Sequence, residues 1–276
     1  MQMFYKNQKE LINDIIYNNI YRNKIDKSYL EKNNLLDHYE CLQGDKSLNY
    51  KKKLDEVKKL VSILNNIEKT SGYPYFCMKS FYNYPFIDDD LDIIVLGDGH
   101  KHYVNELKSL NYFHLSDISD LREPNKKMYK NNDALIIPHI HKQVAWNGII
   151  TGDKEDFYAN SIVKNIDGIK LRIPSHTDEL LIAACHFIFE NYYFKMGDFI
   201  YLKYLLNQNI DYRRIENISL EYGYTKGVEL FFSYLNGFSK DFELNLNIDK
   251  RFKKVEEIDL KKPFPYYIPY NKLIPS

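Results

Sequence analysis

Two aspartates separated by a single residue stand at the start of an apolar segment. Asp90-Leu91-Asp92 runs directly into Ile-Ile-Val-Leu, which ends at Leu96. Side chains at positions i and i+2 of a strand point to the same face, so Asp90 and Asp92 are expected to project together at one end of a buried strand. Two ionised carboxylates side by side repel each other, and a cation between them relieves the repulsion. The pair therefore predicts a divalent-metal site.

An acidic loop is the alternative interpretation of this segment. Asp88 and Asp89 directly precede Asp90, and neighbouring carboxylates often line a solvated turn. Asp92 favours the metal site because it lies inside the apolar run, where an isolated carboxylate is costly unless it is paired or bound to a metal. We expect Asp88 and Asp89 to be solvated.

A short turn precedes the aspartates. Lys79-Ser80 ends an apolar run, and nine residues separate Ser80 from Asp90. This order of features resembles the pattern of the polymerase-beta-like nucleotidyltransferase superfamily. That pattern is a strand, a turn with a small residue, a spacer and then Asp-x-Asp inside an apolar strand. Lys79 before the small residue is similar to a divergent, uncharacterised branch of that superfamily. Three later features are also similar to that branch, namely residues 139–146, the helix expected from Asp178 to His186, and Met196-Gly197-Asp198.

The resemblance implies a chemistry and a role for each of these residues. Two divalent ions, Mg²⁺ or Mn²⁺, would lie between Asp90, Asp92 and the triphosphate of a nucleoside triphosphate such as ATP. An acceptor hydroxyl would attack the α-phosphorus, and pyrophosphate would leave. The backbone amides around Ser80 and the ammonium of Lys79 would bind the nucleotide. The alternative for Lys79 is a side chain that reaches from a strand end into solvent.

His139 stands where the resemblance implies a third carboxylate, and His141 lies two residues beyond it. His139 and His141 share one face of a predicted strand, and no acidic residue lies between Ala134 and Ile150. Imidazole binds metals or acts as a general base near neutral pH, and it suits Mn²⁺ and later transition metals better than Mg²⁺. We therefore expect His139 to be a catalytic residue and a metal ligand, and His141 to be a further ligand. A pair of polar residues on a half-exposed strand is the alternative.

Different functions remain open at this point. The first is a metal-dependent nucleotidyltransferase that transfers a nucleoside monophosphate to an unidentified hydroxyl acceptor on a small molecule, a protein or an RNA. The alternative is a catalytically impaired nucleotidyltransferase-like module that binds a nucleotide, a nucleic acid or a partner protein, which the missing third carboxylate favours. A His/Asp metal site for phosphoester hydrolysis is a third possibility, although further hydrolase motifs are absent.

Composition limits the class of protein. Lys+Arg and Asp+Glu both number 38, so no net positive charge attracts nucleic acid to the chain as a whole. Cys41, Cys77 and Cys185 are far apart, which argues against a disulfide framework and against a cysteine zinc site. No apolar run approaches the roughly 18 residues of a membrane span. We expect a reduced, cytoplasmic protein that has no membrane partner.

The elements that must position the site indicate an α+β fold. We expect a small mixed β-sheet nucleotidyltransferase core flanked by N-terminal helices and a C-terminal helical bundle. The predicted segments are an N-terminal helical segment at 1–70, a nucleotidyltransferase-like α/β core at 71–174, and a C-terminal helical region with an extended Pro-rich tail at 175–276.

Within these segments, hydrophobic periodicity predicts the individual elements. Strands are predicted at Tyr75–Phe81, Leu91–Leu96 and Asp133–Trp146, with a short strand at Phe113–Leu115. Pro138 inside the third strand indicates an edge position or a bulge. Ser175 with Asp178 resembles a capping box before an apolar helix. Helices are predicted beyond it at about 197–207, 211–222 and 225–237.

Overall fold

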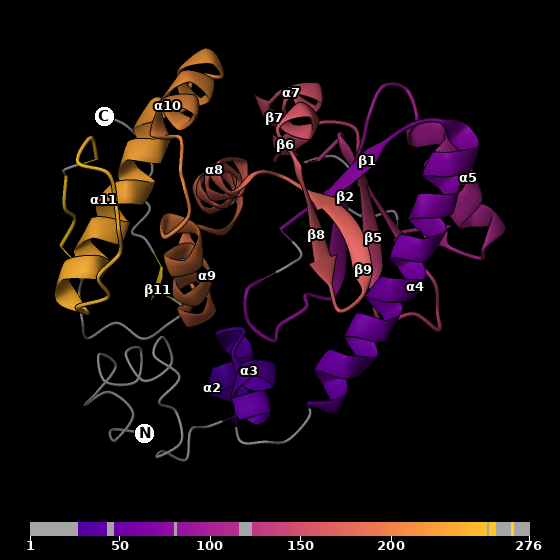
Figure 1. Ribbon diagram of the computed structural model, residues 1–276, viewed down its shortest axis with the longest axis horizontal. Helices are drawn as coiled ribbons and strands as arrows, with labels where there is room; N and C mark the ends of the chain where they lie inside the picture. The colour runs from indigo at the N-terminus through magenta and orange to yellow at the C-terminus, as the bar shows by residue number, and fades with distance from the viewer. Residues whose placement is uncertain are drawn as a thin grey trace. The chain divides into compact units, whose positions relative to one another are not determined.

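The computed structural model describes residues 27–42, 47–79, 82–115, 123–252, 254–257 and 266–267 (Figure 1). These residues form two compact units. The sheet unit comprises the described residues of Leu48–Tyr82 and Ile87–Ile182, and the helical unit comprises those of Met1–Ser47, Asn83–Phe86 and Ala183–Ser276. The division of the chain at residues 70 and 174 stays a prediction.

A five-stranded sheet forms the centre of the sheet unit, with strand order β1-β2-β5-β4-β3. Its strands are β1 (Tyr75–Met78), β2 (Asp90–Val95), β3 (Phe113–His114), β4 (Lys126–Lys130) and β5 (Ile137–His141). β2 pairs with β1 in the antiparallel sense and with β5 in the parallel sense, whereas β4 is antiparallel to both β5 and β3. The sheet is therefore mixed, and the predicted α+β class is confirmed.

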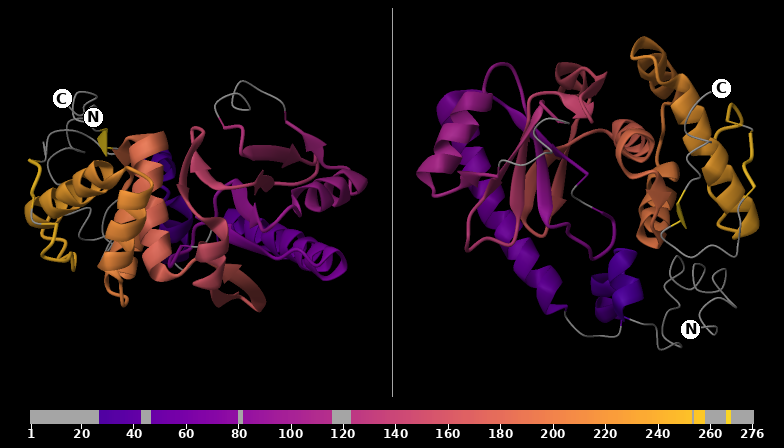
Figure 2. Two further views of the ribbon diagram at one scale, coloured as in Figure 1. Left: turned by 90° about the horizontal axis from the view of Figure 1, so that it is seen from above. Right: turned by 180° about the vertical axis from the view of Figure 1, so that it is seen from behind.

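Two helices cover one face of this sheet, α4 (Leu48–Ser71) and α5 (His100–Ser109), as Figure 2 shows from two further sides. Apolar residues at helical spacing on α4 pack with alternate residues of the strands, and this cluster forms the core of the unit. Cys77, Ile93 and Ile140 lie in that core. Because side chains alternate along a strand, the residues between them, including Asp92 and His139, point to the opposite face.

The predicted strand at Asp133–Trp146 is wrong as a single element. The chain bends at Lys142 and Gln143, so β5 ends at His141 and β6 (Val144–Trp146) begins a separate hairpin with β7 (Ile149–Gly152). Three further elements were not expected and follow it: α7 (Lys154–Ala159), β8 (Ile162–Ile166) and β9 (Ile169–Ile173). β8 and β9 form a second two-stranded hairpin.

Pro138 lies in a central strand, which contradicts a simple edge position. Ile137 donates its N–H to the carbonyl of Asp89 on the β2 side at 2.8 Å, so the nitrogen of the next residue faces β4. The β4–β5 pairing stops at Met128 opposite His139. The missing N–H of Pro138 therefore faces β4, with which Pro138 is not paired, and no ladder hydrogen bond is lost.

The helical unit is built around aromatic side chains. Its described elements are α2 (Lys27–Lys32), α3 (Leu36–Leu42), the π-helix η3 (Phe187–Asn191), β10 (Tyr193–Phe194), α9 (Met196–Leu206), α10 (Tyr212–Glu221), α11 (Thr225–Asp241) and β11 (Tyr266–Tyr267). Phe194 lies at the centre, with ring centroids 4.4 Å from Phe187 and 5.2 Å from Phe238. The predicted C-terminal helical region is confirmed, whereas most of the predicted Pro-rich tail lies outside the described residues.

The helix that begins in the sheet unit, α8 (His176–His186), has the predicted cap. Ser175 Oγ accepts a hydrogen bond from the N–H of Asp178 at 3.1 Å and donates one to its carboxylate at 2.8 Å. His186 is paired with Glu190 at 2.8 Å within the helical unit, which is a structural contact.

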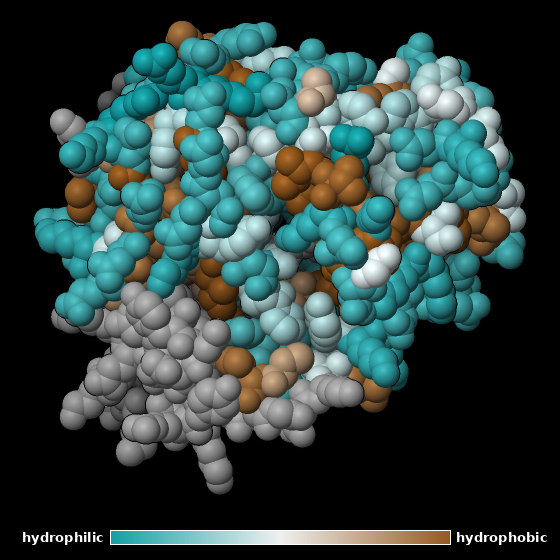
Figure 3. Space-filling model, in the orientation of Figure 1, coloured by the Kyte–Doolittle hydropathy of each residue, from teal (hydrophilic) through white to brown (hydrophobic). Residues whose placement is uncertain are grey.

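Hydrophilic side chains cover most of the face drawn in Figure 3, with separate hydrophobic patches among them. The exposed apolar residues of the two hairpins are Ile149, Ile150, Ile162 and Val163. Across the described ranges, no helix has both the length and the apolar character that a membrane span requires.

Candidate metal and nucleotide site

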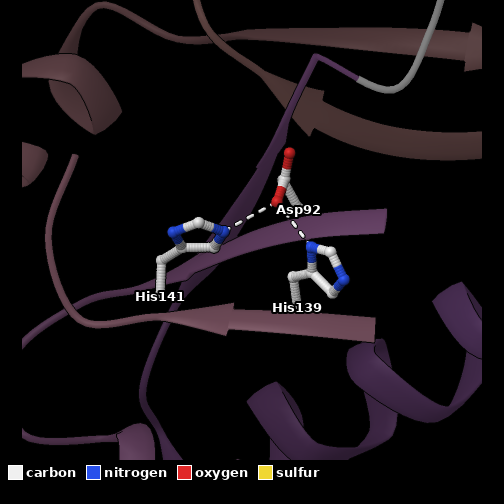
Figure 4. A group of neighbouring side chains, drawn as sticks. All are labelled: Asp92, His139 and His141. Atoms are coloured by element: carbon white, nitrogen blue, oxygen red, sulfur yellow. Dashed lines mark hydrogen bonds and ion pairs between the residues drawn. The ribbon is translucent and has the colours of Figure 1, made fainter. Parts of the chain in front are cut away.

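Asp92 is the centre of the candidate site. It pairs across the parallel strands with His139, so β2 and β5 bring the two side chains to the same face of the sheet. Asp92 Oδ1 lies 2.7 Å from His141 Nε2 and 3.3 Å from His139 Nδ1 (Figure 4). The side chain of Asp92 is only 2% exposed. The structure thus places the two predicted histidines around one oxygen of one predicted aspartate.

Asp90 approaches the same histidine from the start of β2. Its Oδ2 atom lies 3.4 Å from His139 Nδ1, close to the 3.3 Å that separates this nitrogen from Asp92 Oδ1. The two aspartates therefore converge on one point beside His139, as their i, i+2 spacing predicts. Asp90 is the more accessible of the two, with 38% of its side chain exposed.

The charge on Asp92 is stabilised by its neighbours. Burial alone would raise the pKa of Asp92, but the Lys79 ammonium, His141 and hydrogen bonds from both imidazoles outweigh burial and hold this pKa well below its usual range. Burial lowers the pKa of His141 in spite of the neighbouring Asp92. Since the ionised carboxylate of Asp92 only accepts hydrogen bonds, the Nε2 atom of His141 donates the hydrogen bond between them.

Lys79 contributes a cation at the end of β1. Its Nζ atom lies 3.1 Å from Asp92 Oδ2, on the oxygen that the histidines do not contact. The backbone of Lys79 is left-handed, with φ of 58°, which is uncommon for a residue other than glycine. Ser80, the other predicted nucleotide-binding residue, lies outside the described residues.

The acidic residues before Asp90 support the start of β2. Lys53 of α4 lies 2.6 Å from the Asp89 carboxylate and donates a hydrogen bond to the carbonyl of Ile87 at 3.0 Å. The Asp88 side chain accepts a hydrogen bond from the N–H of Asp89 at 3.0 Å. These contacts support the loop that leads to Asp90, and the side chain of Asp89 is 76% exposed.

The arrangement fits a divalent metal ion. Asp92, His139 and His141 each offer a ligand atom, and these atoms all lie within 4.8 Å of one another. His141 Nδ1 is buried and has no hydrogen-bond partner within the described part of the chain, whereas Nε2 of the same ring contacts Asp92. Carboxylate oxygen together with imidazole nitrogen suits Mn²⁺ and later transition metals.

The chain is distantly similar to some solved structures. No protein-family model and no curated protein matches the sequence. One similar solved structure is the lincosamide antibiotic adenylyltransferase LnuA with bound lincomycin, at 16% identity and a TM-score of 0.34, covering 45% of this chain and 83% of that one. Another is an antigenic nucleotidyltransferase-like protein from Paracoccidioides brasiliensis, at 13% identity and a TM-score of 0.43, covering 74% of this chain and 95% of that one.

Two neighbours of the site were not expected from the sequence. The centroid of the Trp146 ring lies 5.8 Å from Lys79 Nζ. Lys126 stands opposite His141 on β4 and forms an ion pair with the buried carboxylate of Glu123. Lys126 could have been placed beside the site only if β4 had been predicted from the sequence. The sequence of β4, Lys-Lys-Met-Tyr-Lys, has too few apolar residues for a strand to be recognised.

The stability of the metal-free protein is expected to depend on pH through Asp90. Burial and the neighbouring Asp92 charge raise the pKa of Asp90 to about 6. Because the pKa of Asp90 is higher in the folded state than in the unfolded state, protonated Asp90 contributes to the free energy of unfolding at low pH. This contribution is lost as the pH rises through 4 to 6. Asp90→Asn avoids this loss, so it should be more stable than the wild type at pH 8 by about 1 kcal/mol, a value reduced for solvent screening of a partly exposed group.

Urea unfolding between pH 4.5 and pH 8 in the presence of a chelator measures this difference. The matched control is Asp133→Asn, which replaces an exposed carboxylate of the same unit. If the difference in the free energy of unfolding between Asp90→Asn and wild type stays constant over this pH range, the pKa of Asp90 is not raised.

Proposed function

We propose that the chain is a metal-dependent nucleotidyltransferase that transfers a nucleoside monophosphate from a nucleoside triphosphate to a hydroxyl acceptor. The observation that carries this proposal is the convergence of Asp90 and Asp92 on His139 Nδ1, at 3.4 and 3.3 Å. Two carboxylates and an imidazole at one point form a ligand set for a divalent ion. The ion supplies charge neutralisation at the phosphates and lowers the pKa of an attacking hydroxyl.

The residues of the chain have distinct roles in this proposal. Asp90, Asp92 and His139 hold the ion, and His141 holds the carboxylate of Asp92 in place or adds a further ligand. Lys79 binds the triphosphate as a point charge. A neutral imidazole has one unprotonated nitrogen, so His139 either binds the ion or, beside the accessible carboxylate of Asp90, accepts the proton of the acceptor hydroxyl.

The second candidate is a module that binds a nucleotide, a nucleic acid or a partner protein without catalysis. Asp92 favours it, because both of its oxygens already face protein cations or N–H groups and its side chain is 2% exposed. A carboxylate that is satisfied in this way needs no metal to be stable.

Transfer of a labelled nucleotide separates the two candidates. The protein is incubated with ATP, GTP, CTP or UTP carrying an α-phosphate label, with Mg²⁺ or Mn²⁺, and with itself, bulk RNA or a metabolite extract as acceptor. Label that moves to an acceptor in the wild type supports the enzyme. Nucleotide binding without transfer to any acceptor supports the module.

Metal and nucleotide are expected to bind jointly. Ligands that bind only the folded state raise its stability by mass action, and a triphosphate that shares the ion with Asp90 and Asp92 binds better when the ion is present. The melting temperature should therefore rise more with nucleotide and Mn²⁺ together than the two separate shifts would add up to. In the double variant Asp90→Asn/Asp92→Asn the joint shift should vanish. A shift that persists there would place the ion elsewhere.

The metal preference should depend on His139. Because imidazole suits softer ions than Mg²⁺, wild-type transfer is expected to be about tenfold faster with Mn²⁺ than with Mg²⁺. His139→Asp supplies a harder ligand and should move the preference toward Mg²⁺. Rates of labelled-nucleotide transfer over a range of both metals measure the ratio, with His176→Asp, a substitution of another partly buried histidine of the sheet unit, as the control. An unchanged ratio in His139→Asp would remove His139 from the ligand set.

A further inference from the structure

The two oxygens of Asp92 contact two different kinds of group. Oδ1 lies near the two imidazoles, 2.7 Å from His141 Nε2 and 3.3 Å from His139 Nδ1, whereas Oδ2 lies 3.1 Å from Lys79 Nζ. In a two-metal site the ions stand about 3.5–4 Å apart, close enough for one carboxylate to offer an oxygen to each. In this site two imidazole nitrogens contact Oδ1 of Asp92, and an ammonium contacts Oδ2.

The ammonium of Lys79 is held by more than the ion pair. Its Nζ atom lies over the Trp146 ring at 5.8 Å from the centroid, within the range of a cation–π interaction. Trp146 is 2% exposed, so neighbouring atoms fix the ring. The left-handed backbone at Lys79, with φ of 58°, sets the direction in which the side chain leaves β1. The cation beside Asp92 Oδ2 is therefore built into the sheet unit.

The charge of the site favours one ion over two. Asp90 and Asp92 supply two negative charges, and Lys79 supplies one positive charge. One divalent ion brings the net charge of these three side chains to +1, and two ions bring it to +3. Asp92 is 2% exposed, and like charges in such a weakly screened place repel strongly.

We infer that the site takes a single divalent ion and that the Lys79 ammonium occupies the second cation position. The ion lies on the Oδ1 side of Asp92, with Asp90 and His139, and Lys79 remains on Oδ2, where it faces the triphosphate. This inference rests on the proposed function, and it replaces the two-ion arrangement that the sequence resemblance implies.

Electron paramagnetic resonance of the protein titrated with Mn²⁺ tests the inference. The wild type should bind one Mn²⁺ per chain and give the six-line spectrum of an isolated ion. Lys79→Met should bind two Mn²⁺ per chain and show the dipolar coupling of ions about 3.5–4 Å apart. Its first ion should bind about tenfold more tightly than in the wild type, because a like charge has been removed.

Two variants serve as controls. Lys79→Arg keeps a cation and should bind one ion, as should Lys58→Met, which removes a lysine paired with Asp167 on the exposed side of α4. Lys79→Gln repeats the neutral substitution with a polar side chain, in case Lys79→Met does not fold.

The outcomes separate this inference from the proposed function. A coupled pair of ions in the wild type, or a single ion in both neutral variants, overturns the role of Lys79 but leaves the metal site in place. No Mn²⁺ on the wild type or on either neutral variant contradicts the proposed function itself. The wild-type spectrum decides between one ion and two without any variant.

Discussion

Replacing Asp92 by asparagine is expected to lower the free energy of unfolding of the metal-free protein by about 3 kcal/mol, because it removes one partner of a buried ion pair. Asp92 is 2% exposed, and the Lys79 ammonium and two imidazole N–H groups point at its oxygens. A neutral amide takes away the ion-pair partner of the ammonium, and its NH₂ group faces a cation or an N–H donor in either orientation. Urea unfolding at pH 7 with a chelator present measures the loss.

The double variant Asp92→Asn/Lys79→Met shows whether the loss comes from the pair. It should be less destabilised than the sum of the two single variants, by about 1–3 kcal/mol, because removing both partners leaves no uncompensated charge. Asp167→Asn breaks the exposed pair with Lys58 and should leave the stability nearly unchanged, since solvent screens that pair. Additive effects of Asp92→Asn and Lys79→Met would contradict the coupling.

Replacing Asp90 by asparagine should abolish most of the nucleotidyl transfer while making the metal-free fold more stable. A metal ion in such a reaction contributes several kcal/mol of transition-state stabilisation, so losing it should slow the transfer by about a thousandfold. Unfolding cannot explain this result, because Asp90→Asn is expected to be more stable than the wild type at neutral pH. Label transfer at saturating Mn²⁺ measures the loss, and Asp133→Asn is the matched control. Activity within a few-fold of wild type would exclude Asp90 from the catalytic machinery.

The central strand of the site could be predicted from the sequence because local pattern and burial agree there. The apolar run after Asp92 forms β2, and the alternation along it places Asp90 and Asp92 on one face of the sheet. The spacing in His-Ile-His places both histidines on one face of β5 in the same way. Alternation in short strands of this kind needs no information about distant residues.

What the sequence could not predict depends on pairing between distant strands. β4 is a Lys-rich strand whose existence depends on hydrogen bonds to β5, so no apolar period marks it. Trp146 reaches Lys79 only because the chain bends after His141 and begins a separate hairpin. The ion pair between Lys79 and Asp92 likewise joins the end of β1 to the middle of β2, a contact fixed by the antiparallel register of Met78 opposite Asp92.

The most direct test is anomalous scattering from a crystal of the protein soaked with Mn²⁺ and a non-hydrolysable nucleoside triphosphate. We expect one Mn²⁺ peak bounded by Asp90, Asp92 and His139, with Lys79 still beside the other oxygen of Asp92 and the triphosphate over both cations. A nucleotide bound elsewhere, or an Asp92 that keeps its contacts to His139 and His141 with no Mn²⁺ beside it, would contradict the claim that these residues form a nucleotidyl-transfer site.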